Sequence, residues 1–111
     1  MPNVHRMVQD FLKNVSAPAA SNSLLMQRDY ELMNLEVTGN AASFSLQVEG
    51  QVVSEDTFHQ MASVNLKSIT LQEAITEPGV YQVELSGWKR VRVNLTAVAD
   101  GTVSVSAKVV G

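Results

Sequence analysis

Cysteine is absent from this 111-residue chain, and charged residues make up only 17% of it. Without cysteine, the protein can form neither disulfides nor thiolate metal sites, and the sequence does not determine the redox compartment. The 8 Lys and Arg are outnumbered by 11 Asp and Glu, for a net charge of −3. A general nucleic-acid binder normally shows a basic stripe instead. The low share of charge is typical of a surface covered by small polar residues or by neighbouring subunits.

Long hydrophobic runs are also missing. No stretch approaches the roughly 20 apolar residues of a membrane span, and residues 1–14 are too polar for a signal peptide. We therefore expect neither a membrane nor nucleic acid among the partners.

Catalytic motifs are equally scarce. The sequence contains no G-x-S-x-G nucleophile elbow, no P-loop and no G-x-G-x-x-G. His5 and His59 are the two histidines, and only His59 has carboxylates nearby, Glu55 and Asp56. That spacing matches no metal-site pattern, so we interpret the group as a solvated loop beside a partly exposed histidine. We expect no catalytic residue, no metal and no cofactor, and predict that the protein is not an enzyme.

Period-two alternation is the strongest positive signal. From Gly79 to Gly111, three runs place an aliphatic or aromatic residue at every second position, at residues 81–85, 91–97 and 103–109. This pattern predicts half-buried antiparallel strands. If the last two runs form a hairpin, Val91 pairs with Val109 so that the inward faces meet. That register leaves 99–101 as a three-residue loop with glycine last, which suits a type I turn followed by a bulge.

The middle of the chain reads as further short strands. Segments 24–26, 30–37, 42–53, 57–66 and 68–74 carry strand patterns, with a bulge expected at Gly50 and a turn at Pro78-Gly79. The expected core members from the weaker segments are Phe58, Met61, Val64, Leu66, Ile69 and Leu71. About eight strands at this spacing predict an all-β antiparallel sandwich of jelly-roll type.

The first residues carry a helical pattern instead. Apolar residues recur at the spacing of one helix face, at Val4, Met7, Val8, Phe11, Leu12 and Val15. We predict an amphipathic α-helix preceding the sandwich, joined to it by a linker rich in small residues. The domains are then a helical arm and linker at 1–22 and a β-sandwich at 23–111. The apolar face either docks on its own sheet or reaches a neighbouring subunit, and both interpretations stay open.

One small surface cluster follows the Ser86-Gly87 turn. Trp88 is either a core or interface anchor or a platform on which a sugar stacks. Arg90 and Arg92 are too few for nucleic-acid binding in an acidic chain. We expect Arg92 to lie opposite an acidic neighbour, in this chain or in an adjacent subunit. With the apolar residues of the predicted helix, these three residues complete the candidate protein interface.

Residues 79–96, GVYQVELSGWKRVRVNLT, and the stretch GTVSVSA at 101–107 follow a recognisable order: G-x-Y-x-V, a basic pair, V-R-V and a G-T-V hairpin. Together with 35–39 and 44–50, they resemble small β-sandwich structural proteins of bacteriophage and prophage particles, over residues 30–111. The resemblance implies a non-enzymatic capsid decoration, neck or tail protein that contacts other virion proteins and forms a homo-oligomer. It implies location in the virion, assembled in the bacterial host cytoplasm. The alternative is a carbohydrate- or receptor-binding sandwich with a glycan as ligand.

Overall fold

The computed structural model describes residues 6–26, 30–53 and 57–111, and these residues form strands and no helix. The strands are β1 (Arg6–Val15), β2 (Ala19–Ala20), β3 (Leu24–Leu25), β4 (Leu32–Gly39), β5 (Ser43–Gln51), β6 (His59–Met61), β7 (Ser63–Asn65), β8 (Thr70–Gln72), β9 (Gly79–Glu84), β10 (Arg90–Ala99) and β11 (Val103–Val110).

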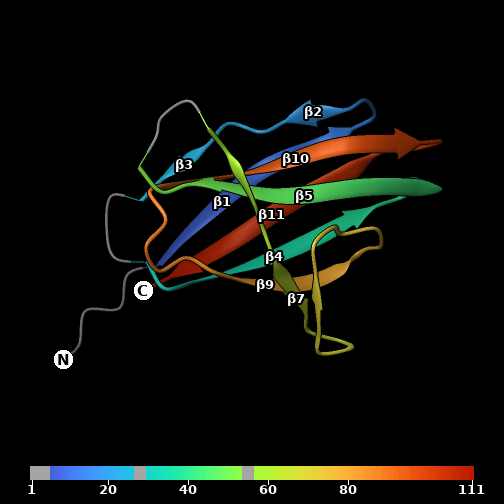
Figure 1. Ribbon diagram of the computed structural model, residues 1–111. Helices are drawn as coiled ribbons and strands as arrows, with labels where there is room; N and C mark the ends of the chain where they lie inside the picture. The colour runs from blue at the N-terminus through green and yellow to red at the C-terminus, as the bar shows by residue number, and fades with distance from the viewer. Residues whose placement is uncertain (1–5, 27–29, 54–56) are drawn as a thin grey trace.

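The strands are arranged in two sheets that face each other (Figure 1). One sheet has six strands in the order β1-β11-β4-β9-β7-β8, and the other has the order β2-β10-β5-β6, with β3 also pairing with β10. Every pairing between these strands is antiparallel. The all-β, two-sheet part of the predicted fold therefore agrees with the structure.

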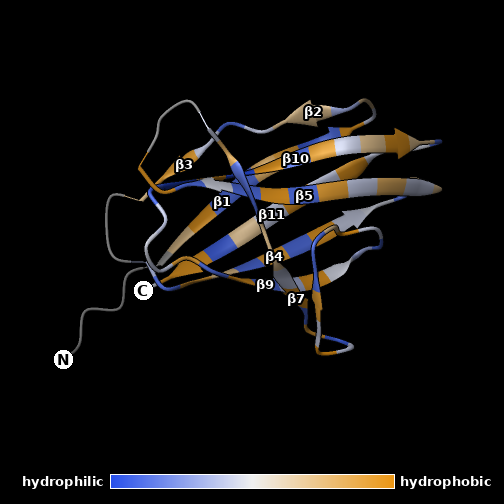
Figure 2. Cartoon of the chain, viewed as in Figure 1, coloured by the Kyte–Doolittle hydropathy of each residue, from blue (hydrophilic) through white to orange (hydrophobic). Residues whose placement is uncertain are grey.

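The core lies between the sheets and is built by the alternation seen in the sequence. Figure 2 shows hydrophobic and hydrophilic bands alternating along the long strands. In β10, Val91, Val93 and Leu95 are fully buried, while the residues between them are half-exposed. The largest fully buried side chain is Tyr81 from β9. Because such burial removes apolar surface from water at about 25 cal/mol per Å2, these inward rows dominate the stability of the fold.

The predicted N-terminal helix is wrong, because residues 6–15 form β1, which pairs with β11 from Arg6↔Val110 to Val15↔Val103. The pairing is interrupted between Asp10 and Leu12 and again before Val15. A β-bulge inserts an extra residue and resets which side chain points inward. As a result the consecutive residues Phe11 and Leu12 are both buried. The bulges thus convert a strand's alternation into a spacing that imitates a helix face.

The predicted hairpin between the last two strands is also wrong. β10 pairs with β5, β2 and β3, whereas β11 pairs with β1 and β4 in the opposite sheet. Asp100 and Gly101, with φ of 57° and 149°, carry the chain from one sheet to the other. The inward rows do meet, but across the core rather than side by side. The same residues point inward whether the two strands pair side by side or face each other across the core. The alternation therefore could not distinguish these two arrangements.

The N-terminal segments contribute to both sheets, since β1 extends the six-stranded sheet and β2 pairs with β10 in the other. They lie on the N-terminal side of the predicted domain boundary at residues 22 and 23. That boundary stays a prediction about which part of the chain folds independently.

Candidate functional site

The candidate interface residues occupy two separate places in the fold. Those from the N-terminal segment lie on β1, at the end of the six-stranded sheet, and those around Trp88 lie at the start of β10 in the other sheet. Val4 is outside the described residues. The structure therefore presents two surfaces, which the sequence had treated as one set.

On β1 only one of the candidate side chains is largely in water. Val8 is 70% exposed, whereas Phe11 and Leu12 are in the core and Met7 and Val15 pack against it. Near Val8, the outer face of the six-stranded sheet holds a hollow of about 270 Å3. Its lining mixes apolar residues such as Val80 with the charged residues Glu36 and Lys108. This face offers contact area to a macromolecule.

Arg92 is held in place by its own sheet. The register sets it opposite Glu49 of β5, and its Nε lies 2.9 Å from Glu49 Oε1. Its guanidinium carbon stands 3.7 Å from the centre of the Phe58 ring, and Asn94 Nδ2 donates to the other Glu49 oxygen at 3.3 Å. The prediction of an acidic neighbour opposite Arg92 is confirmed, and the neighbour belongs to the same chain. Arg92 thus contacts one oxygen of the Glu49 carboxylate and one face of the aromatic ring, as expected for a cross-strand pair with cation–π stacking.

Arg90 has a looser environment. Its Nη1 lies 3.3 Å from Ser23 Oγ, and it shares a hollow of about 220 Å3 with Ser23, Gln51 and Phe58. A guanidinium group with several N–H donors in such a hollow can hydrogen-bond a carboxylate or a hydroxyl-rich ligand. Among the described residues near Trp88, Arg90 and Arg92, this hollow is the best-defined place for a small molecule to bind.

Trp88 packs onto the core. A Cβ atom on Gly50 would lie 2.5 Å from Trp88 Cε3 and 2.7 Å from Met61 Sδ, so the indole ring sits directly against the Gly50 backbone. No bulge occurs at Gly50, because the β5–β10 register passes through it without a shift and slips only between Leu95 and Ala97. The glycine is there to admit the ring. One part of the indole is thereby occupied by protein, which favours the anchor interpretation of Trp88 over a free stacking platform.

A second apolar surface was missed by sequence reasoning. Of the expected core residues in this region, Met61 is buried, but Leu66, Ile69 and Leu71 are 36%, 73% and 72% exposed on the β7–β8 hairpin. Ile69 also has a φ of 54°, which is unusual for a β-branched residue. The turn is fixed by Asn65, whose side-chain oxygen accepts from the Lys67 amide at 3.0 Å. The placement of these residues in the core was wrong because they lie on β8 and on the turn before it, at the end of the sheet, where β8 has only one pairing partner.

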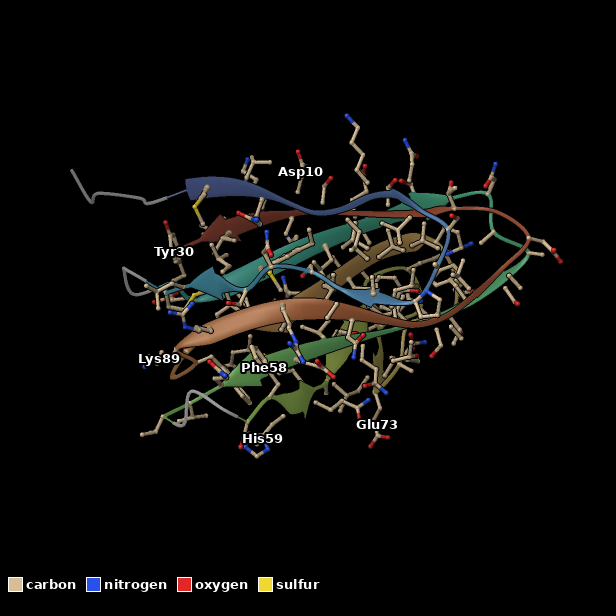
Figure 3. All side chains as sticks on the ribbon, turned by 90° about the horizontal axis from the view of Figure 1, so that it is seen from above. Asp10, Tyr30, Phe58, His59, Glu73 and Lys89 are labelled. Atoms are coloured by element: carbon tan, nitrogen blue, oxygen red, sulfur yellow. The ribbon has the colours of Figure 1, made fainter. Side chains whose placement is uncertain are left out.

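Across residues 6–26, 30–53 and 57–111, no group of three or more His, Asp or Glu side chains is placed to hold a metal ion. His59 is exposed at the start of β6, on the border of the molecule in Figure 3, and the candidate loop carboxylates Glu55 and Asp56 lie outside the described residues. The same described ranges include no helix that is long and apolar enough to cross a membrane.

Two solved structures share this fold over the whole chain. The SPBc2 prophage-derived protein YomS superposes with a TM-score of 0.89 at 13% identity, covering 100% of this chain and 97% of YomS. The PBSX exported protein XepA superposes with a TM-score of 0.93 at 16% identity. All of this chain is covered in that match, which spans 39% of XepA. At identities this low, the two superpositions show a common fold alone. No protein-family model and no curated protein sequence matches the chain.

Proposed function

We propose that the protein is a non-enzymatic structural component of a bacteriophage or prophage particle, where it assembles with other virion proteins and with copies of itself. The observation that carries the proposal is the fold likeness to YomS, a prophage-derived protein, which extends over nearly the full length of both chains. The fold likeness to XepA, described as an exported PBSX protein, points the same way.

The surface supports an assembly function. The described residues expose apolar side chains at Val8 on one end of the six-stranded sheet and at Ile69 and Leu71 on the other. Exposed apolar groups with few charges are typical of surfaces that a partner covers. An enzyme would instead bring acid, base or nucleophilic groups together in a cleft.

The test is mass spectrometry of particles purified by density gradient after induction of the source prophage or phage. We expect this chain to co-purify with the particles at a fixed ratio to the major capsid protein. An abundant host cytoplasmic protein serves as the negative control. Detection of the chain in the cleared lysate or the medium, combined with its absence from intact particles, would contradict the proposal.

The alternative, a carbohydrate- or receptor-binding module, is favoured by one feature, the hollow that Arg90 shares with Ser23 and Phe58. A glycan array with the purified protein tests it. Binding that disappears in Arg90→Ala and persists in Lys108→Ala, an exposed cation on the other sheet, would support this function. A blank array across acidic and neutral glycans would count against it.

A further inference from the structure

β1 is a long strand with one open side. Seven of its ten residues have a partner in β11, and at the end of the six-stranded sheet it pairs, among the described residues, with no other strand. The other strands at the sheet ends, among the described residues, have two or three residues each: β2, β6 and β8. A long open edge presents a row of unpaired N–H and C=O groups and is a template for another strand. β1 is therefore the edge at which strand addition is best supported.

Only the first half of β1 is regular enough to accept a further strand on its other side. From Arg6 to Asp10 the register with β11 runs without a shift, and both irregularities follow Asp10. Asn14, beyond the first of them, has a φ of 50°. Bulges bend and twist an edge away from a potential partner. The straight template is thus the segment 6–10.

We propose that segment 6–10 pairs antiparallel with the same segment of a second copy of this chain, about a twofold axis at Val8. This inference rests on the self-assembly part of the proposed function and names the surface that performs it. The twofold register sets Val8 opposite Val8, Met7 opposite Gln9, and Arg6 opposite Asp10. Isologous contacts of this kind are the commonest interfaces in homo-oligomers.

Charge complementarity selects a second copy as the occupant. In this register each Asp10 stands opposite an arginine position of the partner's strand, and opposite charges at directly facing positions favour an antiparallel pair. A twofold axis at Gln9 would instead set Val8 against Asp10, and an axis at Asp10 would bring two carboxylates together. Asp10 is exposed and its Oδ1 accepts a hydrogen bond from Ser106 Oγ at 2.8 Å, which fixes the carboxylate on the outer face of the sheet. Figure 3 shows Asp10 projecting from β1 away from the body of the molecule.

Exposure of Val8 agrees with the same register. Its side chain is 70% exposed in the single chain, and pairing about Val8 covers it with the identical side chain of the second copy. Directly opposed residues of an antiparallel pair have Cβ atoms about 4.5–5.5 Å apart. A residue two positions from the axis is four residues along the strand from its own symmetry mate, which is roughly 14 Å at about 3.4 Å per residue.

The absence of cysteine makes this geometry directly testable. Val8→Cys introduces one thiol at the axis, and Asp10→Cys introduces one on the same face but away from it. On mild oxidation of the full chain, we expect Val8→Cys to form a disulfide-linked dimer and Asp10→Cys to remain monomeric on non-reducing gels. Equal crosslinking of both variants, or crosslinking of neither, would overturn the proposed register.

Charge reversal provides the second arm, read by sedimentation velocity over a range of protein concentration. The wild type is expected to show a concentration-dependent dimer. Asp10→Arg loses it, because two arginines then face each other, and Arg6→Asp combined with Asp10→Arg restores it. Lys13→Glu, beyond the first irregularity, is the matched control and keeps the dimer. Circular dichroism establishes that each variant is folded.

A wild type that stays monomeric at every concentration overturns the proposal and leaves the β1 edge to a strand of another protein. A dimer that is indifferent to all these changes also overturns it and places self-association elsewhere. Neither outcome alters whether the chain co-purifies with particles, so failure of this inference is distinguishable from failure of the proposed function.

Discussion

Replacing Gly50 with alanine is expected to destabilise the protein, because the new methyl group enters space that the Trp88 ring fills. The added Cβ would lie 2.5 Å from Trp88 Cε3 and 2.7 Å from Met61 Sδ. Such overpacking typically costs about 1–3 kcal/mol. Alanine also removes the extra flexibility of a glycine within a strand, which returns roughly 0.5–1 kcal/mol. The difference between these two effects is centred on about 1 kcal/mol and reaches at most about 2.5 kcal/mol. Each kcal/mol lost should lower Tm by about 4–8 °C.

The assay is equilibrium unfolding in urea, followed by circular dichroism and by the fluorescence of Trp88, the one tryptophan in the chain. Gly87→Ala is the matched control, since nothing lies within 4 Å of its added Cβ but its φ is +87°. There the cost comes from the left-handed backbone alone, about 1 kcal/mol, and the environment of Trp88 should be unaltered.

A double-mutant cycle isolates the contact. In a Trp88→Ala background the ring is gone, so Gly50→Ala should lose most of its cost, and the two changes should couple by about 0.5–3 kcal/mol. A Gly50→Ala protein as stable as the wild type, with unchanged tryptophan emission, would refute the packing of the indole on β5. Trp88 would then be free to act as a stacking platform.

Three further changes test other contacts. Arg92→Met removes the ion pair with Glu49 and the ring stacking but keeps the apolar stem, and should lower the unfolding free energy by about 1–2 kcal/mol in urea titrations. Burial, reinforced by a neighbouring carboxylate, raises the pKa of Tyr81 above 10.0; its stabilising contribution is complete below about pH 10 and is lost as the pH rises through the folded-state pKa. Tyr81→Phe should therefore flatten the alkaline fall in stability. Ile69→Asn, at a φ of 54°, should raise stability by about 1 kcal/mol; Leu71→Asn, equally exposed in a strand, should show no such gain in thermal melts.

Alternation along the chain predicted most of the inward residues of the last three strands. It was wrong at Ala97, which is exposed because the register of β10 with β5 shifts between Leu95 and Ala97. Tyr81, Val93 and Val105 are all buried as the pattern requires. The pattern could not give topology, because an inward residue is compatible with a neighbour in the same sheet or with one across the core. The crossing at Asp100 and Gly101 depends on which strands are available to pair with β10, and that is decided by distant segments such as β5.

The candidate surfaces were only partly predictable for a related reason. The Arg92–Glu49 pair joins opposite charges on neighbouring strands. The sequence predicted an acidic residue opposite Arg92 but did not identify which one. The exposed Ile69 had no such signal, since a short apolar run looks the same in a core strand and in a projecting hairpin. Burial there depends on whether another layer covers the strand, which is a tertiary property.

Removal of residues 1–22 is the change that best separates the two descriptions of the N-terminal segment. A separable arm would leave a stable domain at 23–111. In the structure, however, β1 covers one side of β11 and brings Phe11 and Leu12 into the core. Truncating side chains of this kind to alanine costs about 3–5 kcal/mol for phenylalanine and 2–5 kcal/mol for leucine.

Their combined loss is comparable to the roughly 5–15 kcal/mol that stabilises a whole domain. A shortened protein beginning at Ser23 should therefore be unfolded or nearly so by circular dichroism and limited proteolysis. Within the full chain, Phe11→Ala should lower the unfolding free energy by about 3–5 kcal/mol, whereas Val8→Ala, at an exposed position of the same strand, should change it by less than about 0.5 kcal/mol. If the shortened protein melts as the full chain does, the sandwich folds without β1, and the N-terminal strand is free to exchange onto a neighbouring copy.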